Sequence, residues 1–138
     1  MGQLEGTETQ ARLRRLLADE ALQNRRCLYF ARDEDNAGDI VRAGLFAETA
    51  ETATTHAWKL LDHLIAEGDP VSGEDCRDAA GRLRSVEQAE LRAAEDYAAA
   101  AETARGEGLE ELATLLDTLG QARRERAGYL GRLGKDSN

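Results

Sequence analysis

The chain has 138 residues, of which 33% are charged and only 4% are aromatic, with a single proline. This length suits one domain with one core, and the composition favours helices while giving β-sheets little to pack with. The formal charge of −9, from 18 Lys plus Arg against 27 Asp plus Glu, argues against nucleic acid as a partner, because no basic face is available to neutralise phosphates. The sequence has neither an apolar run of about 18 residues nor an apolar signal core, so we expect a cytoplasmic protein with no membrane association.

The first predicted helix spans about residues 7–35. Thr7 and Gln10 form a capping-box pattern at its start, and the charged run "RDEDNAGD" ends it. The second predicted helix spans about residues 40–66 and ends at "EGDPVSG", where glycine and proline cluster. The apolar stripes of these two helices consist of Leu13, Leu16, Leu17, Leu22, Cys27 and Phe30, and of Phe46, Ala50, Ala53, Leu60 and Leu64.

The third predicted helix spans about residues 74–105, with Gly81 marking a short separate turn near its start, and "RGEG" ends it. The fourth spans about residues 109–133 and is followed by the polar tail "GKDSN", which we expect to fray. Four long amphipathic segments with short connections predict an all-α fold, an antiparallel four-helix bundle that forms a single domain over residues 1–138.

The two cysteines lie far apart and form no Cys-x-x-Cys motif or Cys/His cluster. This spacing excludes a zinc knuckle, a rubredoxin-type iron site and a thioredoxin-like redox pair. Cys27 falls on an apolar stripe and is predicted to be a core residue, whereas Cys76, in a polar connection, is predicted to be accessible.

Polar side chains interrupt the predicted apolar stripes at matching places. Glu20 follows Leu13 by seven residues, and Glu90 follows Leu83 by seven. His56 falls on the apolar side of the second helix, and Glu125 lies close to the stripe of the fourth. A buried carboxylate costs several kcal/mol unless it is paired, protonated or bound to a metal.

Two interpretations of this polar cluster remain open. Carboxylates and an imidazole from four facing helices are the ligands that a non-haem iron or manganese centre needs, so Glu20, His56, Glu90 and Glu125 are candidate metal ligands. Tyr97, Tyr129 and Gln121 are candidates to hydrogen-bond these ligands. In the alternative interpretation, the acids belong to a metal-free Glu–Arg or Glu–His network, with Arg14, Arg25, Arg92 or Arg124 folding back on them.

Two stretches resemble the N-terminal helix pair of rubrerythrins, diiron proteins of the ferritin-like superfamily: "LEGTETQARLRRLLADEALQNRRCLYFA" and "GLFAETAETATTHAWKLL". The resemblance continues more weakly through "AEDYAAAAETARGEGLEELATLLDTLGQARRERAGYL". It implies a ferritin-like, rubrerythrin-type bundle in which the first and third helices each supply a Glu, and the second and fourth each supply a Glu-x-x-His pair. On this basis Glu20 and Glu90 match the single carboxylates and His56 matches the histidine of the second helix.

The sequence departs from the rubrerythrin pattern at both bridging glutamates. Ala53 stands at the first of these positions, and an alignment through Tyr129 places Ala122 at the second and Glu125 at the second histidine. Ala93 and Ala94 occupy the region of the family's extra glutamate, Cys27 stands in place of a tyrosine, and we find no C-terminal rubredoxin domain. Two neighbouring metal ions need bridging anions to offset their repulsion, so an ordinary diiron centre is not expected.

Three functions therefore remain open. The first is a metal-binding oxidoreductase with an altered iron or manganese site that takes a small-molecule oxidant or substrate. The second is a metal-free bundle that serves binding or structure. The third is a diiron peroxidase in which Glu48, Glu51 or Glu87 replaces the lost bridges. Family members commonly pair, and Leu45, Phe46 and Trp58 offer apolar surface, so we expect a homodimer.

Overall fold

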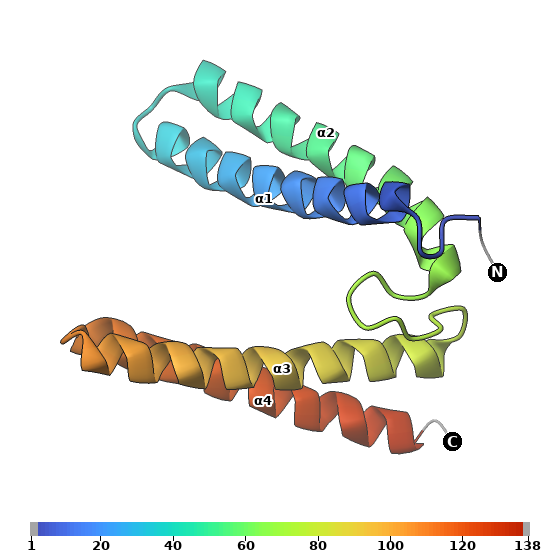
Figure 1. Ribbon diagram of the computed structural model, residues 1–138. Coiled ribbons are helices and arrows are strands. Elements are labelled where there is room, and N and C mark those ends of the chain that lie inside the picture. Colours follow the sequence, from blue (N-terminus) through green and yellow to red (C-terminus); the bar gives the residue numbers. More distant parts are fainter. Residues whose placement is uncertain (1–2, 137–138) are drawn as a thin grey trace. The chain divides into compact units, whose positions relative to one another are not determined.

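The computed structural model describes residues 3–136, and the regular structure in this range is entirely helical (Figure 1). The chain divides into two units, Met1–Pro70 and Val71–Asn138, and each contains one pair of packed helices. The prediction of an all-α fold is confirmed. The two units are described separately below.

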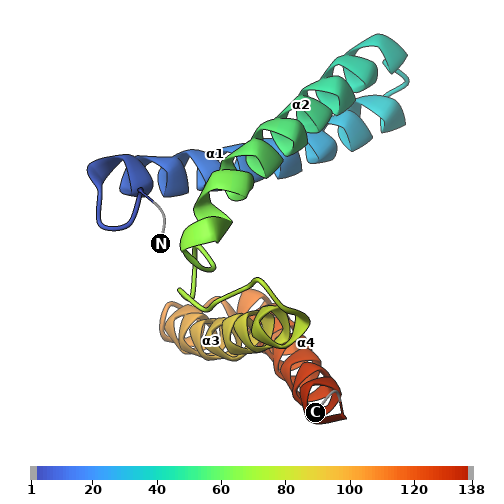
Figure 2. The same cartoon turned by 90° about the vertical axis from the view of Figure 1, so that its right-hand side faces the viewer.

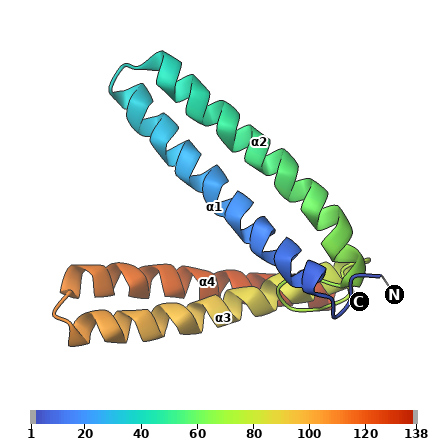
Figure 3. The ribbon, with the colours of Figure 1, turned by 45° about the horizontal axis from the view of Figure 1, so that its top comes forward.

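The first unit is a helical hairpin made of α1 (Glu8–Asn36) and α2 (Ile40–Leu64), which lie side by side (Figures 1 and 3). Thr7 caps α1 by accepting a hydrogen bond from the Gln10 backbone N at 3.0 Å, as the sequence predicts. The Gln10 side chain in turn accepts from the backbone N of Gly6 rather than from Thr7 itself. Gly38, with φ of 84°, makes the tight turn between the helices, and a short 3-10 helix, η1 (Ile65–Glu67), follows α2.

The two helices of the first hairpin meet along a seam whose residues recur alternately every three and four positions. The buried and half-buried residues of α1 at this spacing are Gln10, Leu13, Leu17, Glu20, Asn24, Cys27, Ala31 and Glu34. Those of α2 are Ala43, Phe46, Ala50, Ala53, Ala57, Leu60 and Leu64. This is the heptad spacing of a two-stranded coiled coil, and the alanines of α2 allow the two helices to pack closely.

The second unit begins with a loop and continues into α3 (Ala79–Gly106) and α4 (Glu110–Asp136), which form the second hairpin (Figure 2). Its seam has the same heptad spacing, with Leu83, Glu87, Glu90, Ala94, Tyr97, Ala101 and Ala104 on α3 and Ala113, Leu116, Gly120, Arg123, Ala127, Leu130 and Gly134 on α4. A Cβ added to Gly120 would lie 2.9 Å from Cβ of Tyr97, so the approach of the two helices here requires a glycine.

The loop before α3 packs against the first turns of that helix. Arg82 donates to the backbone oxygen of Cys76 at 3.0 Å, and the hydroxyls of Ser72 and Ser85 lie 2.8 Å apart. Gly81 is buried under this loop, and a Cβ at this position would lie 1.8 Å from the backbone oxygen of Asp75. The loop therefore depends on a glycine in the first turn of α3.

Several sequence predictions in this region need correction. The third helix starts at Ala79 rather than near residue 74, because Asp78 caps it by accepting from the backbone N of Gly81, which lies inside the helix rather than in a separate turn. Cys76 is buried, with 8% of its surface exposed, because the loop folds back, whereas Cys27 is buried as predicted. The fourth helix continues through residues 134–136, where fraying was expected, and residues 137–138 of that tail lie outside the described residues.

The predicted apolar stripes are only partly buried within their own hairpins. Leu16, Leu22 and Phe30 of the first predicted stripe are exposed, because the heptad seam places other residues between the two helices. On α4 a second heptad series runs beside the seam and is exposed along its length. Its members are Leu112, Leu115, Leu119, Ala122, Arg126, Tyr129 and Leu133.

In the part of the chain that the structure describes, no helix has the length and apolarity needed to cross a membrane.

Candidate functional site

Glu20 and His56 lie together across the seam of the first hairpin. Nδ1 of His56 is 2.7 Å from Oε2 of Glu20, a hydrogen-bonding distance between α2 and α1. The Glu20 side chain is 21% exposed and the His56 side chain is 55% exposed. The imidazole that the sequence places on the apolar side of α2 therefore sits at the edge of the seam, beside the acid.

A cavity of about 410 Å³ adjoins this pair. Leu16, Asp19, Lys59 and Leu60 line it together with Glu20 and His56. The site thus combines two apolar walls with charges of both signs at a surface groove. Glu20 and His56 are the two predicted ligands that the structure brings together.

Glu90 forms the corresponding polar contact of the second hairpin. Its Oε2 accepts a hydrogen bond from Nε of Arg123 on α4. The Glu90 side chain is only 17% exposed, so this ion pair is more shielded from water than an ordinary surface pair. The acid is neutralised by a guanidinium within its own hairpin.

The registers of the two seams show which residues occupy equivalent places. Asn24 donates to the backbone oxygen of Ala50 at 2.9 Å, and one step further along the antiparallel seam Glu20 faces Ala53. In the second hairpin, a Cβ on Gly120 would meet the backbone oxygen of Ala94, and the same step brings Glu90 opposite Arg123. Arg123 therefore stands on α4 where Ala53 stands on α2.

The remaining predicted site residues on α4 lie elsewhere on that helix. Glu125 is exposed and follows Arg123 by two residues, which rotates it by about 200° around the helix axis, away from the α3 seam. Its Oε1 accepts from Nε2 of Gln121 at 3.4 Å. Ala122 is exposed, in contrast to the buried Ala53.

Among the described residues, the two tyrosines proposed to hydrogen-bond the ligands form no hydrogen bond with Glu90 or Glu125. The Tyr97 side chain lies in the seam against Gly120. Tyr129 is exposed, and the guanidinium of Arg126 lies 5.5 Å from its ring centroid.

The predicted four-ligand centre can be tested for fit only within each hairpin. Among the side chains of residues 3–135, no three from His, Cys, Asp or Glu come close enough together to hold a metal ion. Glu20 and His56 meet in one hairpin, while in the other Glu90 is held by Arg123 and Glu125 faces away from it. The second hairpin therefore does not bring together the ligands that its half of a metal site would need.

The sequence predicted a Glu–Arg or Glu–His network but not Arg123, the arginine that pairs with Glu90. In the described part of the chain, none of the four arginines considered, Arg14, Arg25, Arg92 and Arg124, forms an ion pair with Glu20 or Glu90. The available signal was the heptad spacing of Leu116, Gly120 and Arg123, which places Arg123 in the seam. The candidate replacements Glu48 and Glu51 are exposed on α2, and Glu87 lies in the α3 seam near Gly131.

No protein-family model matches this sequence, and no curated protein matches it.

Proposed function

We propose that this chain is a rubrerythrin-like protein that has exchanged metal chemistry for a binding or structural role. The observation that supports this function best is the ion pair of Glu90 with Arg123. A guanidinium beside Glu90 supplies positive charge where a metal pair would require a second carboxylate. Glu20 has a hydrogen-bonding partner in His56, so neither acid depends on a metal for compensation.

We propose further that the two hairpins pack into one antiparallel, ferritin-like four-helix bundle. The exposed heptad series on α4 supports this arrangement, since a stripe that is apolar except at Arg126 is normally covered by a partner helix. In the first hairpin, Leu16 is exposed beside His56 and supplies apolar surface for such a contact. A homodimer remains our expectation for the bundle, to be measured by sedimentation velocity.

The deciding experiment is the metal content of protein purified without a metal-affinity tag from cells supplied with iron and manganese. The proposal predicts less than about a tenth of an equivalent of either metal, and a melting temperature that chelator leaves unchanged, because a bound metal would stabilise the folded state. Stoichiometric iron or manganese would refute the metal-free function. Glu20→Gln and His56→Ala, with Asp33→Asn on an exposed part of α1 as the control, would then locate the ion.

A metal-binding oxidoreductase remains the second candidate, favoured by the 2.7 Å approach of His56 to Glu20 beside an open cavity. A carboxylate and an imidazole in contact are two ligands of the type that iron and manganese accept. This candidate requires metal that is lost in both Glu20→Gln and His56→Ala. The third candidate, a diiron peroxidase, additionally requires peroxide turnover with an external reductant.

A further inference from the structure

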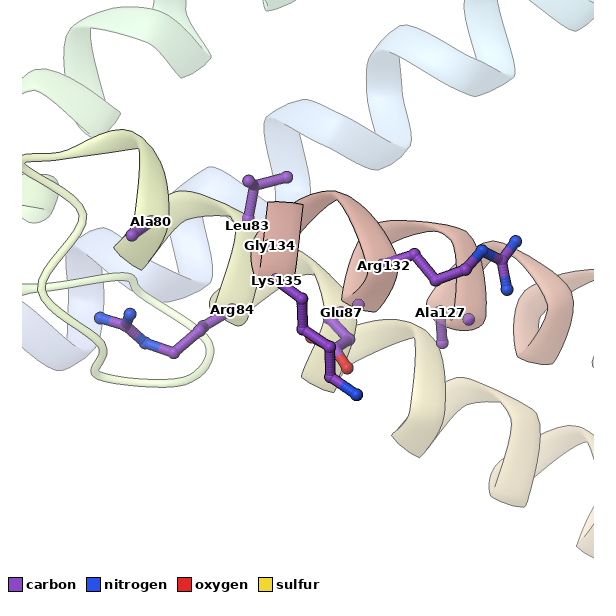
Figure 4. A pocket seen from close by; sticks show the side chains of 10 residues that line it. Ala80, Leu83, Arg84, Glu87, Ala127, Arg132, Gly134 and Lys135 are labelled. Carbon is purple, nitrogen blue, oxygen red and sulfur yellow. The ribbon is translucent and has the colours of Figure 1, made fainter. Parts of the chain in front are cut away.

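A second cavity lies inside the second unit, between the first turns of α3 and the last turns of α4, and has a volume of about 420 Å³ (Figure 4). Ala80, Leu83, Arg84 and Glu87 line it from α3. The residues that line it from α4 are Ala127, Gly128, Gly131, Arg132, Gly134 and Lys135. The cavity combines a small-residue and apolar floor with a charged rim.

The rim of this cavity is basic although the chain as a whole is strongly acidic. Three cationic side chains, Arg84, Arg132 and Lys135, surround a single carboxylate, Glu87. Arg84 lies 3.7 Å from Glu74, so part of its charge is already compensated. Arg132 and Lys135 have no ion-pair partner among the residues that the structure describes. Two cations are therefore available to an anionic ligand.

The glycines of α4 keep the cavity open. A Cβ on Gly131 would lie 2.9 Å from Oε1 of Glu87, whereas a Cβ on Gly134 would meet nothing within 4 Å. Each glycine in a helix costs about 1 kcal/mol relative to alanine, so this spacing weakens the end of α4 while leaving space beside the cations. Larger side chains at Gly128 or Gly131 would occupy that space.

The geometry points to a binding site for a small organic acid that carries two or more carboxylates and a hydroxyl group. Arg132 and Lys135 would bind the carboxylates through charge-assisted hydrogen bonds, supported by Arg84. In Figure 4 the side chains of Glu87 and Lys135 extend in the same direction, with those of Arg84 and Arg132 on either side. Glu87 would accept a hydrogen bond from the hydroxyl, because a carboxylate offers acceptors only.

This site is separate from the contacts on which the proposed function rests. The exposed heptad series of α4 includes Leu119 and Leu133, whereas the cavity lies on the side of Gly128 and Gly131. These two sides of the helix are roughly half a turn apart at 100° per residue. Ligand binding at this cavity does not require a metal.

The test is calorimetric titration of the full chain with citrate at constant ionic strength. We expect saturable binding of one citrate, with the double variant Arg132→Gln, Lys135→Gln weakening it by at least about tenfold. Arg12→Gln, which removes an exposed cation paired with Glu8 in the first hairpin, is the matched control and should leave the affinity unchanged. Absence of saturation, or equal loss in the control, would overturn the site.

Two further measurements separate a built site from general attraction of anions. Gly128→Leu keeps every charge and improves helix propensity but fills the cavity, so it should abolish citrate binding. Citrate binding that persists in Gly128→Leu would show that the cavity is not the site. Tricarballylate has the carboxylates of citrate without its hydroxyl and should bind more weakly; equal binding of the two acids would refute the role of Glu87.

Discussion

Arg123 donates a hydrogen bond to Glu90 across the second hairpin, in the place where Ala53 faces Glu20 in the first. The two hairpins thus share a seam spacing and a matching acid but compensate that acid differently. In the first hairpin the partner is His56, at the edge of the seam, and in the second it is Arg123, within the seam. The charge pair also favours one register, since a slip of α4 along α3 would leave both groups without a partner.

Arg123→Gln should destabilise the second hairpin. Glu90 would then be a half-buried carboxylate without its cation, and we expect a loss of about 1–2 kcal/mol in the free energy of unfolding, scaled down from a fully buried pair because Arg123 is 40% exposed. Urea unfolding followed by circular dichroism measures this. The neighbouring substitution Arg124→Gln, on an exposed residue, is the control.

Replacing both members of the Glu90–Arg123 pair tests whether Arg123 only neutralises the charge of Glu90 or whether the ion pair itself adds to the stability of the hairpin. The double variant Glu90→Leu, Arg123→Leu should recover most of the stability lost in Arg123→Gln, because it removes the unpaired charge and adds apolar seam residues. A double variant as unstable as the single one would show that the pair itself stabilises the hairpin.

The sequence predicted the elements of this fold better than their packing. Amphipathic periodicity and capping residues such as Thr7 located four helices to within a few residues, except at the start of α3, where a glycine-containing loop folds back on the helix. Periodicity assigned Leu16 to the core with the seam residues Leu13 and Leu17, because a broad apolar stripe does not specify which residues face the partner helix.

For the candidate site, the sequence predicted the two residues that meet in the first hairpin but not the ion pair of the second. Glu20 and His56 stood out because polar residues interrupt apolar stripes, and the structure joins them. The sequence did not predict the role of Arg123, because an arginine on an amphipathic helix is normally assigned to the solvent-exposed face. Its aliphatic stem can nevertheless lie in the seam while its charged end reaches an acid. The alignment of α4 with the rubrerythrin pattern depended on Tyr129. This residue is exposed, so it does not fix which residues of α4 face α3.

Gly120→Ala should separate α3 from α4. The added Cβ would lie 2.9 Å from Cβ of Tyr97, an atom fixed to the backbone, so the helices must move apart. We expect a loss of about 1–3 kcal/mol, typical of overpacking, against a background gain in helix propensity. Thermal unfolding followed by circular dichroism measures this loss. Gly44→Ala is the control and should be neutral or stabilising, because nothing lies within 4 Å of the new Cβ.

Gly81→Ala should release the loop that precedes α3. A Cβ there would lie 1.8 Å from the backbone oxygen of Asp75, and neither backbone can yield without breaking the loop contacts. The burial of Cys76 depends on this loop, so its thiol should react faster with a disulfide reagent in the variant. The measurement uses a Cys27→Ser background, with Gly106→Ala as the control because no atom lies within 4 Å of its added Cβ. Unchanged reactivity of Cys76 would contradict the role assigned to Gly81.

Acid should weaken the same loop through Asp75. The side-chain hydrogen bond from Arg77 lowers the pKa of Asp75 from its ordinary 3.8 to about 2, and a backbone hydrogen bond from Arg77 adds to this. Because the folded-state pKa is depressed, the contribution of this pair to stability is present above pH 4 and is lost as the pH falls through about 2. The carboxyl carbon shift of Asp75, followed by NMR over this range, reports the pKa directly. Arg77→Gln should raise that pKa toward 3.8, whereas Arg12→Gln should leave it unchanged, and a pKa near 2 in both variants would show that Arg77 is not the cause.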